Sequence, residues 1–159
     1  MKSIPLTRGF VALVDDEDFD WLNQFKWSVN PSYGNHYARS CTKGKSEYMH
    51  RLILKVKPGE FTDHIDGDGL NNTRRNLRLA TQSQNMENRN KTCMNTSGFK
   101  GVHYSHQKGN IKKPWMATIC INYRNLHLGY FSTAEEAAVA YDEAAIKYFR
   151  EFAKTNFGI

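Results

Sequence analysis

The segment between residues 62 and 89 constrains the fold more than any other part of the chain. An Asp-His pair, Asp63 and His64, ends a β-prone run, and a turn rich in Gly and Asn follows it. Residues 76–80 (NLRLA) then alternate in polarity as a short returning strand. Residues 81–84 (TQSQ) have the spacing of a capping box, so a helix is expected to begin there. The segment therefore predicts a strand, a tight turn, a second strand and a helix.

This order of elements brings four polar side chains together, although Asn76 and Asn85 lie 12 and 21 residues after His64. The order Asp-His, Asn and Asn at these spacings resembles the H-N-H homing endonucleases of the ββα-metal fold, in the variant whose last His is Asn. The resemblance implies that His64 is the general base and that Asn76 orients its ring. It also implies that Asp63 and Asn85 bind one divalent metal ion.

Phosphodiester cleavage explains why these residue types suit the task. A water molecule must lose a proton, and a neutral imidazole accepts it well because its pKa lies near working pH. A divalent cation offsets the charge that builds on the phosphate, and hard oxygen ligands select Mg²⁺, or Mn²⁺ in its place. One carboxylate and one amide leave most coordination positions open, so we expect the metal to bind weakly until DNA is present.

Two other kinds of metal site fit the segment poorly. Placing Asp66 and Asp68 at the third and fifth positions of a calcium loop puts His64 first. Arg75 would then take the final position, where a bidentate Glu is needed. A zinc site lacks ligands, since the three Cys form no CxxC pair and no His or Cys pair has finger spacing. An Asn-rich turn alone is common, and only the complete set of residues favours a catalytic site.

The composition suits one or two globular domains, with 159 residues of which 40% are hydrophobic and 13% aromatic. A formal net charge of +6 and a pI near 9.2 favour a polyanionic partner, and the resemblance implies that this partner is double-stranded DNA. No apolar signal segment follows Met1 and no run approaches the length of a membrane span, so we expect a cytoplasmic protein that acts on DNA and is not secreted. An odd number of scattered Cys disfavours a disulfide framework.

Residues 1–48 predict a strand at residues 10–14, an acidic helix and a hairpin with its tip at residues 43–45. This region carries no catalytic set of its own. It resembles the leader that precedes many phage-type H-N-H nucleases, including the run YMHRLIL. His50 and Arg51 in that run have two interpretations, since they either pack within an amphipathic helix or clamp a DNA phosphate beside the metal.

Positive residues cluster around the proposed site between residues 74 and 91, with Glu87 as the one acid among them. This cluster predicts a phosphate-facing surface that includes Arg74, Arg75 and Arg78. Residues 88–97 are polar and lack periodicity, so they predict a linker with a domain boundary near 92–97. We therefore expect a nuclease domain over residues 1–93 and a second domain over residues 97–159.

The second domain is expected to contain three antiparallel strands and an alanine-rich helix, which a second capping box at residues 133–136 opens. Strand alternation divides the sheet into two faces. One face carries Ala117, Ile119, Ile121, Leu126 and Leu128, and the other carries Met116, Thr118, Cys120, Asn125 and His127. The first face is expected in the core, and the second faces solvent or a ligand.

The runs SGFKGV, LHLGYF and STAEEAAVAYDEAA resemble the Apetala/ethylene-response-factor DNA-binding domain across residues 97–157. In that family the sheet enters the major groove, which is wide enough for a β-ribbon. The DNA face carried over onto this chain comprises Lys100, Gly101, His103, Thr118, Asn125 and His127. The plant domains place several Arg and a Trp on this face, so their sequence preference does not transfer. Tyr123 replaces a hairpin Gly, which leaves the conformation of that turn open.

These features predict an α+β protein: a ββα-metal nuclease domain followed by a three-stranded antiparallel sheet packed on one helix. The predicted function is a metal-dependent, site-selective DNA endonuclease of the homing type, acting as a monomer that nicks one strand, because one catalytic set cuts one strand. The alternative is a non-catalytic DNA-binding regulator on a nuclease scaffold, which the complete catalytic set disfavours. An RNA-binding protein is disfavoured as well, because the third strand offers His127 where stacking aromatics are needed.

Overall fold

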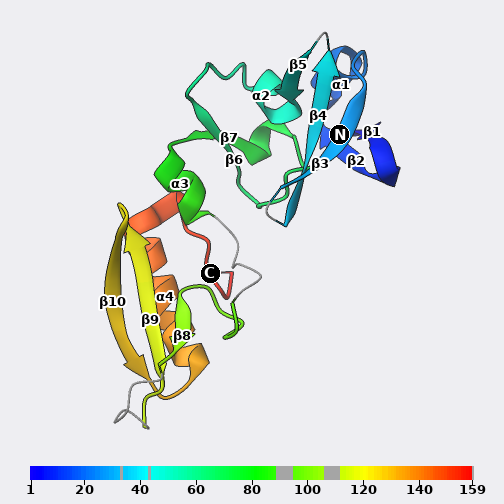
Figure 1. Cartoon of the computed structure of the whole chain (residues 1–159). Helices are drawn as coiled ribbons and strands as arrows, with labels where there is room; N and C mark the ends of the chain where they lie inside the picture. Colours follow the sequence, from blue (N-terminus) through cyan, green and yellow to red (C-terminus); the bar gives the residue numbers. More distant parts are fainter. Residues whose placement is uncertain (33, 43, 89–94, 106–111, 159) are drawn as a thin grey trace. The chain divides into compact units, whose positions relative to one another are not determined.

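The computed structural model describes residues 1–32, 34–42, 44–88, 95–105 and 112–158. The chain forms two compact units, Met1–Asn85 and Met86–Ile159, called the N-terminal and C-terminal units below (Figure 1). Helices and antiparallel sheets occur along the chain, so the predicted α+β class is confirmed. The expected linker falls largely on residues 89–94, outside the described residues, and the domain boundary stays a prediction. None of the described helices is long and apolar enough to cross a membrane.

The N-terminal unit begins with short strands and helices that build its core. In chain order they are β1 (Lys2–Pro5), η1 (Thr7–Gly9), β2 (Val11–Val14), α1 (Asp16–Leu22), β3 (Trp27–Ser32), β4 (Asn35–Thr42), β5 (Lys45–Tyr48) and α2 (Met49–Ile53). β1 pairs with β2, and β3, β4 and β5 form an antiparallel meander, so the expected strand and hairpin are both present. Apolar side chains from these elements meet in one core: Ile4, Val14, Leu22, Trp27, Met49 and Ile53.

The segment that we expected to hold the site follows α2. It contains β6 (Phe61–His64), η2 (Arg74–Asn76), β7 (Leu77–Ala80) and α3 (Gln82–Glu87). β6 and β7 are antiparallel. At the start of α3 the Thr81 hydroxyl accepts from the Gln84 N–H at 3.2 Å, and the Gln84 side chain accepts from the Thr81 N–H at 2.7 Å. The predicted capping box is therefore present, and so is the strand–turn–strand–helix order.

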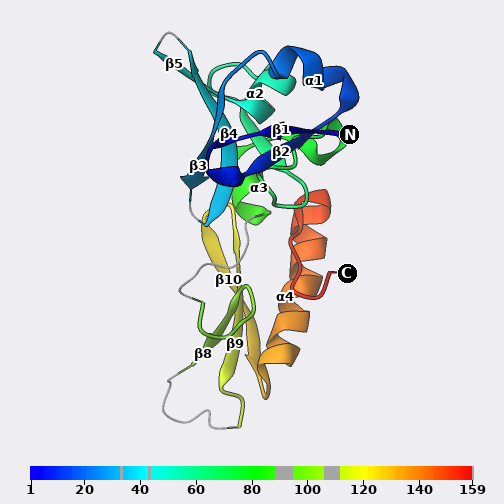
Figure 2. The same ribbon diagram turned by 90° about the vertical axis from the view of Figure 1, so that its right-hand side faces the viewer.

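The C-terminal unit is a sheet with one helix along one of its faces (Figure 2). Its elements are β8 (Val102–Tyr104), β9 (Trp115–Ile121), β10 (Arg124–Phe131), α4 (Ala134–Phe149) and η3 (Arg150–Phe152), with the strands in the order β10-β9-β8. Ala137 and Ala138 on α4 are fully buried and pack in a cluster with Val102 and Ala117 of the sheet. Small side chains let the helix approach the strands closely, as the alanine-rich pattern predicts.

A buried carboxylate ties the C-terminal segment to α4. Asp142 is 0% exposed and accepts from the backbone N–H of Asn156 at 2.8 Å and of Phe157 at 3.0 Å. The Asn156 side chain also donates to Asp142 at 2.9 Å, while its oxygen accepts from the Lys100 N–H at 2.7 Å. One residue of the helix thus holds the chain end against the loop that precedes β8.

We expect Asp142→Ala to lower the free energy of unfolding of the C-terminal unit by about 3 kcal/mol, because several buried donors lose their acceptor. Thermal unfolding of the full chain measures the effect. Glu143→Ala is the matched control, because Glu143 is the exposed neighbour on the same helix. Equal unfolding midpoints for the two variants would contradict the proposed role of Asp142.

Candidate active site

Asp63 lies in a buried ion pair at the centre of the β6–β7 hairpin. It is opposite Arg78 in the strand register and is 8% exposed. The Arg78 guanidinium donates to its Oδ2 through Nε at 2.8 Å, and Nη2 lies 2.7 Å from the same oxygen. A buried carboxylate needs a compensating charge or hydrogen bonds. The position therefore accommodates a positive group next to Asp63.

His64 is buried at 6% exposure and contacts an asparagine that the sequence did not single out. Its Nε2 lies 3.3 Å from Oδ1 of Asn72, which is fully buried. The Asn72 Nδ2 group donates to the carbonyls of Gly69 and Leu70, so its Oδ1 is the acceptor that faces the ring. We infer from this network that Nε2 carries the ring proton. Nδ1 is then the nitrogen that can accept one.

We had expected Asn76 to orient the His64 ring. In the structure its side chain contacts the turn between β6 and β7 instead. Its Nδ2 donates to Asp66 Oδ1 at 2.9 Å and to the Asn71 carbonyl at 2.8 Å, and its Oδ1 accepts from the Asp66 N–H at 3.0 Å. The structure places Asn72 on the ring instead. The signal for Asn72 in the sequence is the Asn71–Asn72 pair within the turn, which we expected only to form the turn.

The Asp66 carboxylate is a hub of the same turn. Burial alone would raise the pKa of Asp66, but hydrogen bonds from the N–H of Asp68 and the amides of Asn76 and Asn71 outweigh it, so the pKa lies below its ordinary value. The charged carboxylate is thus the form that the turn stabilises. Protonating it would weaken the turn that carries Asn72.

The N-terminal strands hold this turn from two sides. Leu13 of β2 accepts from the Asn72 N–H at 2.8 Å, and its own N–H donates to the Leu70 carbonyl at 2.9 Å. From β4, the Asn35 amide donates to the Gly67 carbonyl at 2.8 Å. A Cβ at Gly69 would lie 2.4 Å from the His36 carbonyl oxygen, so only glycine fits there. The leader region, without a catalytic group of its own, therefore positions the site.

A cluster of rings surrounds His64. The His50 ring lies edge-to-face with it at 5.0 Å between centroids, and Tyr37 lies 5.8 Å from both rings. Tyr48 stacks on His50 at 5.5 Å. Burial, followed by the charges of His64 and Arg51, lowers the pKa of His50 to about 3. His50 is therefore neutral, and its Nδ1 has no hydrogen-bond partner among the described residues.

His64 itself is poised as a neutral base. Burial lowers the pKa of its imidazole below the ordinary value, while the Asn72 hydrogen bond and the nearby carboxylates act in the opposite direction without cancelling the effect. A buried neutral imidazole can accept a proton at neutral pH. The buried ring is therefore chemically able to act as a general base, and that role stays a prediction.

Most of the basic side chains that we expected on a DNA surface serve the fold. Arg51 donates to the carbonyls of Glu60 and Lys57, so the structure favours the packing interpretation for it, as for buried His50. Arg74 makes a bidentate contact with Asp18 of α1 at 2.7 and 2.8 Å, but its side chain stays partly exposed, so its assignment to the phosphate-facing surface stays a prediction. Arg78 is paired with Asp63 as described. Arg75 remains exposed.

The donors for a metal fit its chemistry, although they are few. Asp63 offers a carboxylate whose surroundings already accept the positive Arg78 guanidinium, and Asn85 offers an amide from the start of α3, where its N–H donates to Thr81. No cluster of three or more His, Cys, Asp or Glu that could bind a metal occurs within the described residues. A hard cation would therefore need water and phosphate oxygens to complete its coordination.

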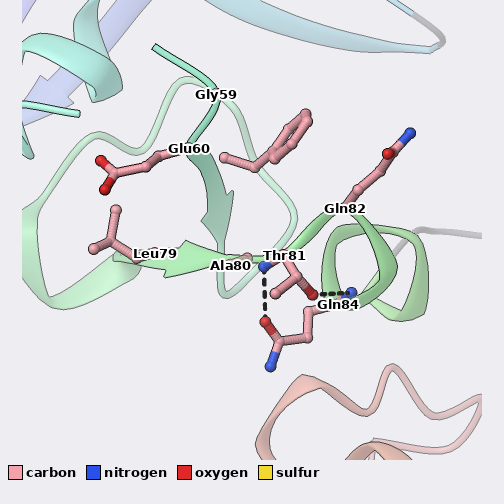
Figure 3. Close-up of a pocket in the computed structure, with 8 residues that line it drawn as sticks. Gly59, Glu60, Leu79, Ala80, Thr81, Gln82 and Gln84 are labelled. Carbon is pink, nitrogen blue, oxygen red and sulfur yellow. Dashed lines mark hydrogen bonds between the residues drawn. The ribbon is translucent and has the colours of Figure 1, made fainter. Parts of the chain in front are cut away.

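A cavity of about 520 Å³ lies beside the hairpin rather than at the candidate site (Figure 3). Its lining is Gly59, Glu60, Phe61, Leu79, Ala80, Thr81, Gln82 and Gln84. None of the four candidate catalytic and metal residues lines it. The polar side chains of its lining are Glu60, Thr81, Gln82 and Gln84, with no histidine or basic group among them, so the cavity does not mark the proposed site.

The C-terminal sheet divides the expected DNA-face residues into two groups. Strand pairing places His127 beside Thr118, Asn125 beside Cys120 and His103 beside Met116, all on the face away from α4. Lys100 and Gly101 lie on the other side. The Lys100 ammonium donates to the Glu87 carbonyl, and a Cβ at Gly101 would overlap the Tyr141 ring at 2.0 Å. Both residues therefore support packing on α4, and their assignment to the DNA face stays a prediction.

We expect the N-terminal unit to lose stability in acid through His50. The unfolded chain protonates His50 near pH 6.5, whereas the folded unit leaves it neutral until about pH 3. The unfolded state thus binds more protons in this window, so stability falls as the pH drops through it. Between pH 7 and pH 4, urea unfolding should show a loss about 3 kcal/mol larger for the wild type than for His50→Phe.

The control for this measurement is His36→Phe, which removes another histidine of the same unit outside the contact with His64. It should retain the steep acid loss. Identical pH profiles for His50→Phe and the wild type would show that His50 is not held neutral by the fold.

Comparison with known proteins agrees with this arrangement. A family model described as HNH endonuclease matches residues 47–87, which include the whole β6–β7 segment. In its C-terminal part, the chain is 48% identical over 65 residues to an AP2-like ethylene-responsive transcription factor of Arabidopsis thaliana, and it spans 11% of that protein. It is 38% identical over 64 residues to Protein 3.8 of Escherichia phage T7 and spans half of it. No solved structure matches.

One relative covers nearly the entire chain. A protein of Acanthamoeba polyphaga mimivirus named as an HNH endonuclease is 31% identical over 155 residues, which are 94% of this chain and 76% of the viral protein. The family model, this long alignment and the Asp63–His64 geometry concern the same segment. The chain belongs to the HNH endonuclease family.

Proposed function

We propose that this protein is a metal-dependent, site-selective DNA endonuclease of the homing type, with His64 as its general base. One observation carries the proposal: His64 is buried, neutral and hydrogen-bonded at Nε2 to Asn72, beside the Asp63 carboxylate. A fixed neutral imidazole next to a carboxylate can take the proton of an attacking water beside a bound cation, which suits hydrolysis of a phosphodiester.

In the proposed reaction a water molecule attacks the scissile phosphorus while His64 Nδ1 takes its proton. The contact with Asn72 favours the tautomer of His64 with its proton on Nε2, in which Nδ1 is the proton acceptor. Asn76 stabilises the turn that carries Asn72. The bond from phosphorus to the 3′ oxygen then breaks and the leaving oxygen takes a proton from a solvent water, which gives a 5′-phosphate and a 3′-hydroxyl. Arg75, which is exposed within η2, would contact the DNA backbone.

Asp63 and Asn85 would hold the divalent cation, most simply Mg²⁺, with Mn²⁺ as a substitute. When bound, it supplies charge neutralisation for the phosphate oxygens. Without the cation, the Arg78 guanidinium neutralises the negative charge of Asp63. Its guanidinium is a planar donor that suits phosphate oxygens equally well, so it is available to the DNA once Asp63 has another partner.

The C-terminal sheet is the proposed DNA reader. Its face away from α4 carries His103, Thr118, Asn125 and His127, which can donate to or accept from base edges. A reader joined to a weakly binding catalytic unit raises the effective concentration of the scissile bond. With one catalytic set per chain, we propose a monomer that nicks one strand.

A second candidate is a non-catalytic DNA-binding regulator that retains the nuclease fold. The observation in its favour is the Asp63–Arg78 ion pair, because a carboxylate with its own counter-ion needs no metal. The two candidates differ in one result, since the regulator does not cleave DNA in any divalent metal.

Supercoiled plasmid provides the test of the leading proposal. We expect the wild type to convert it to open circles with Mg²⁺ and to leave it intact with EDTA. His64→Ala should cleave at least about 100-fold more slowly, because it lacks the base, and should still shift DNA in a gel. Near-normal cleavage by this variant would rule out His64 as the base, and linear product from the first time points would rule out nicking.

Arg78 permits a separate test of the metal site without cleavage. Removing its charge should let DNA-free Arg78→Gln bind Mn²⁺ about tenfold more tightly than the wild type in calorimetry. Its unfolding midpoint should drop without metal, because Asp63 loses its counter-ion, and recover when Mn²⁺ is added.

Two further variants complete the metal experiment. Asp63→Asn should lose Mn²⁺ binding, whereas Arg75→Gln, the exposed neighbour, should match the wild type. If Arg78→Gln is not rescued by Mn²⁺, Asp63 and Arg78 form a purely structural pair and the assignment of Asp63 as a metal ligand fails.

A further inference from the structure

The turn between β9 and β10 holds a bulky residue in a conformation that favours glycine. Ile121 pairs with Arg124, so Asn122 and Tyr123 form a two-residue hairpin loop. Their φ values are 48° and 62°, both in the left-handed region, as in a type I′ turn. Asn adopts this conformation readily, but a Tyr does so only with steric strain. The sequence did not predict the backbone conformation of this turn. The structure shows the conformation of an Asn-Gly hairpin turn, with Tyr123 at the position of the Gly.

No contact of the Tyr123 side chain within the described residues offsets this strain. Tyr123 is 70% exposed, and no hydrogen bond or ring contact joins it to the described part of the chain. An exposed aromatic also brings no gain in solubility. A strained, exposed, unpacked ring at a fixed position is the pattern expected of a residue kept for contact with another molecule.

The ring stands at the tip of the β9–β10 hairpin. β8 pairs with Trp115–Ala117 and the Thr118 N–H donates to the Gly101 carbonyl at 2.8 Å, so beyond Thr118 β9 and β10 pair with each other alone within the described residues. On the face away from α4 the two strands carry polar or small side chains: Thr118, Cys120, Asn125 and His127. A two-stranded ribbon of this kind fits the major groove of B-form DNA. Tyr123 and the exposed Arg124 are the first residues of the ribbon from its tip.

We propose that Tyr123 is a DNA-positioning contact, in which its ring packs on a deoxyribose and its hydroxyl donates to a backbone phosphate oxygen of duplex DNA. This inference rests on the proposed role of the C-terminal sheet as a DNA reader. A phenol offers one donor and an apolar face, which match sugar and phosphate rather than a particular base edge. Arg124 lies next to it and adds a charge contact with the same backbone. The contact fixes how the ribbon sits in the groove and carries no sequence preference.

The test is fluorescence anisotropy with the full chain in EDTA, using several unrelated DNA duplexes. Tyr123→Gly should bind all of them about tenfold more weakly, and by the same factor. Its C-terminal unit should unfold about 4 °C higher, because Gly relieves the strain. Tyr123→Phe keeps the ring but lacks the hydroxyl, so its affinity for DNA should lie between those of the wild type and Tyr123→Gly. Asn122→Gly is the matched control, since it alters the same turn but retains the ring, and it should bind like the wild type.

The outcomes separate this inference from the function on which it rests. If the wild type shows no salt-dependent binding of duplex DNA, the reader assignment itself fails. If the wild type binds and Tyr123→Gly binds equally well, Tyr123 is not a DNA contact. If Tyr123→Gly loses both affinity and thermal stability, the tyrosine acts by maintaining the turn, and the inference is likewise overturned. Weaker binding together with higher stability is the result that supports it.

Discussion

A buried network of amide side chains in the turn between β6 and β7 supports everything that the site can do. Asn72 and Asn76 are almost completely shut off from solvent, and a buried amide costs free energy unless its donors and acceptor are satisfied. Their partners are carbonyls of the turn, the Asp66 carboxylate and the His64 ring. A satisfied network of this kind permits few alternative arrangements. A turn of Gly and Asn, which is flexible in isolation, thereby becomes a rigid mount for His64.

The same network explains why a nuclease segment of about forty residues comes with a leader. The turn has no strand neighbour within its own hairpin, so its outer backbone groups need partners from elsewhere. Leu13 and Asn35 provide them, and Gly69 lets the turn lie directly on β4. The Arg74–Asp18 contact fastens η2 to α1 in the same way. The leader thus forms the second layer on which the β6–β7 hairpin packs.

The net positive charge of the chain overstates the positive charge available to DNA, because several basic side chains contact other groups of the protein. The formal charge of +6 suggested a broad basic surface, yet Arg51, Arg74 and Arg78 each contact carbonyls or carboxylates of the N-terminal unit. In the C-terminal unit, burial lowers the pKa of Lys100 to about 8, and its ammonium binds the Glu87 carbonyl. Contact with DNA then depends on a smaller number of exposed groups, which makes the placement of each one more important.

The sequence by itself determined the order of the helices and strands, because that order depends on interactions between residues close together in the chain. Strand alternation, the Gly and Asn turn and the two capping boxes act over a few residues, and each has its expected counterpart in the structure. Only the tertiary structure decided which side chains meet. Asn72 rather than Asn76 contacts the ring, Arg74 belongs to Asp18, and Gly101 is required by Tyr141. The last two contacts join residues 56 and 40 positions apart, and no local pattern records such a pairing, because the packing of separate elements creates it.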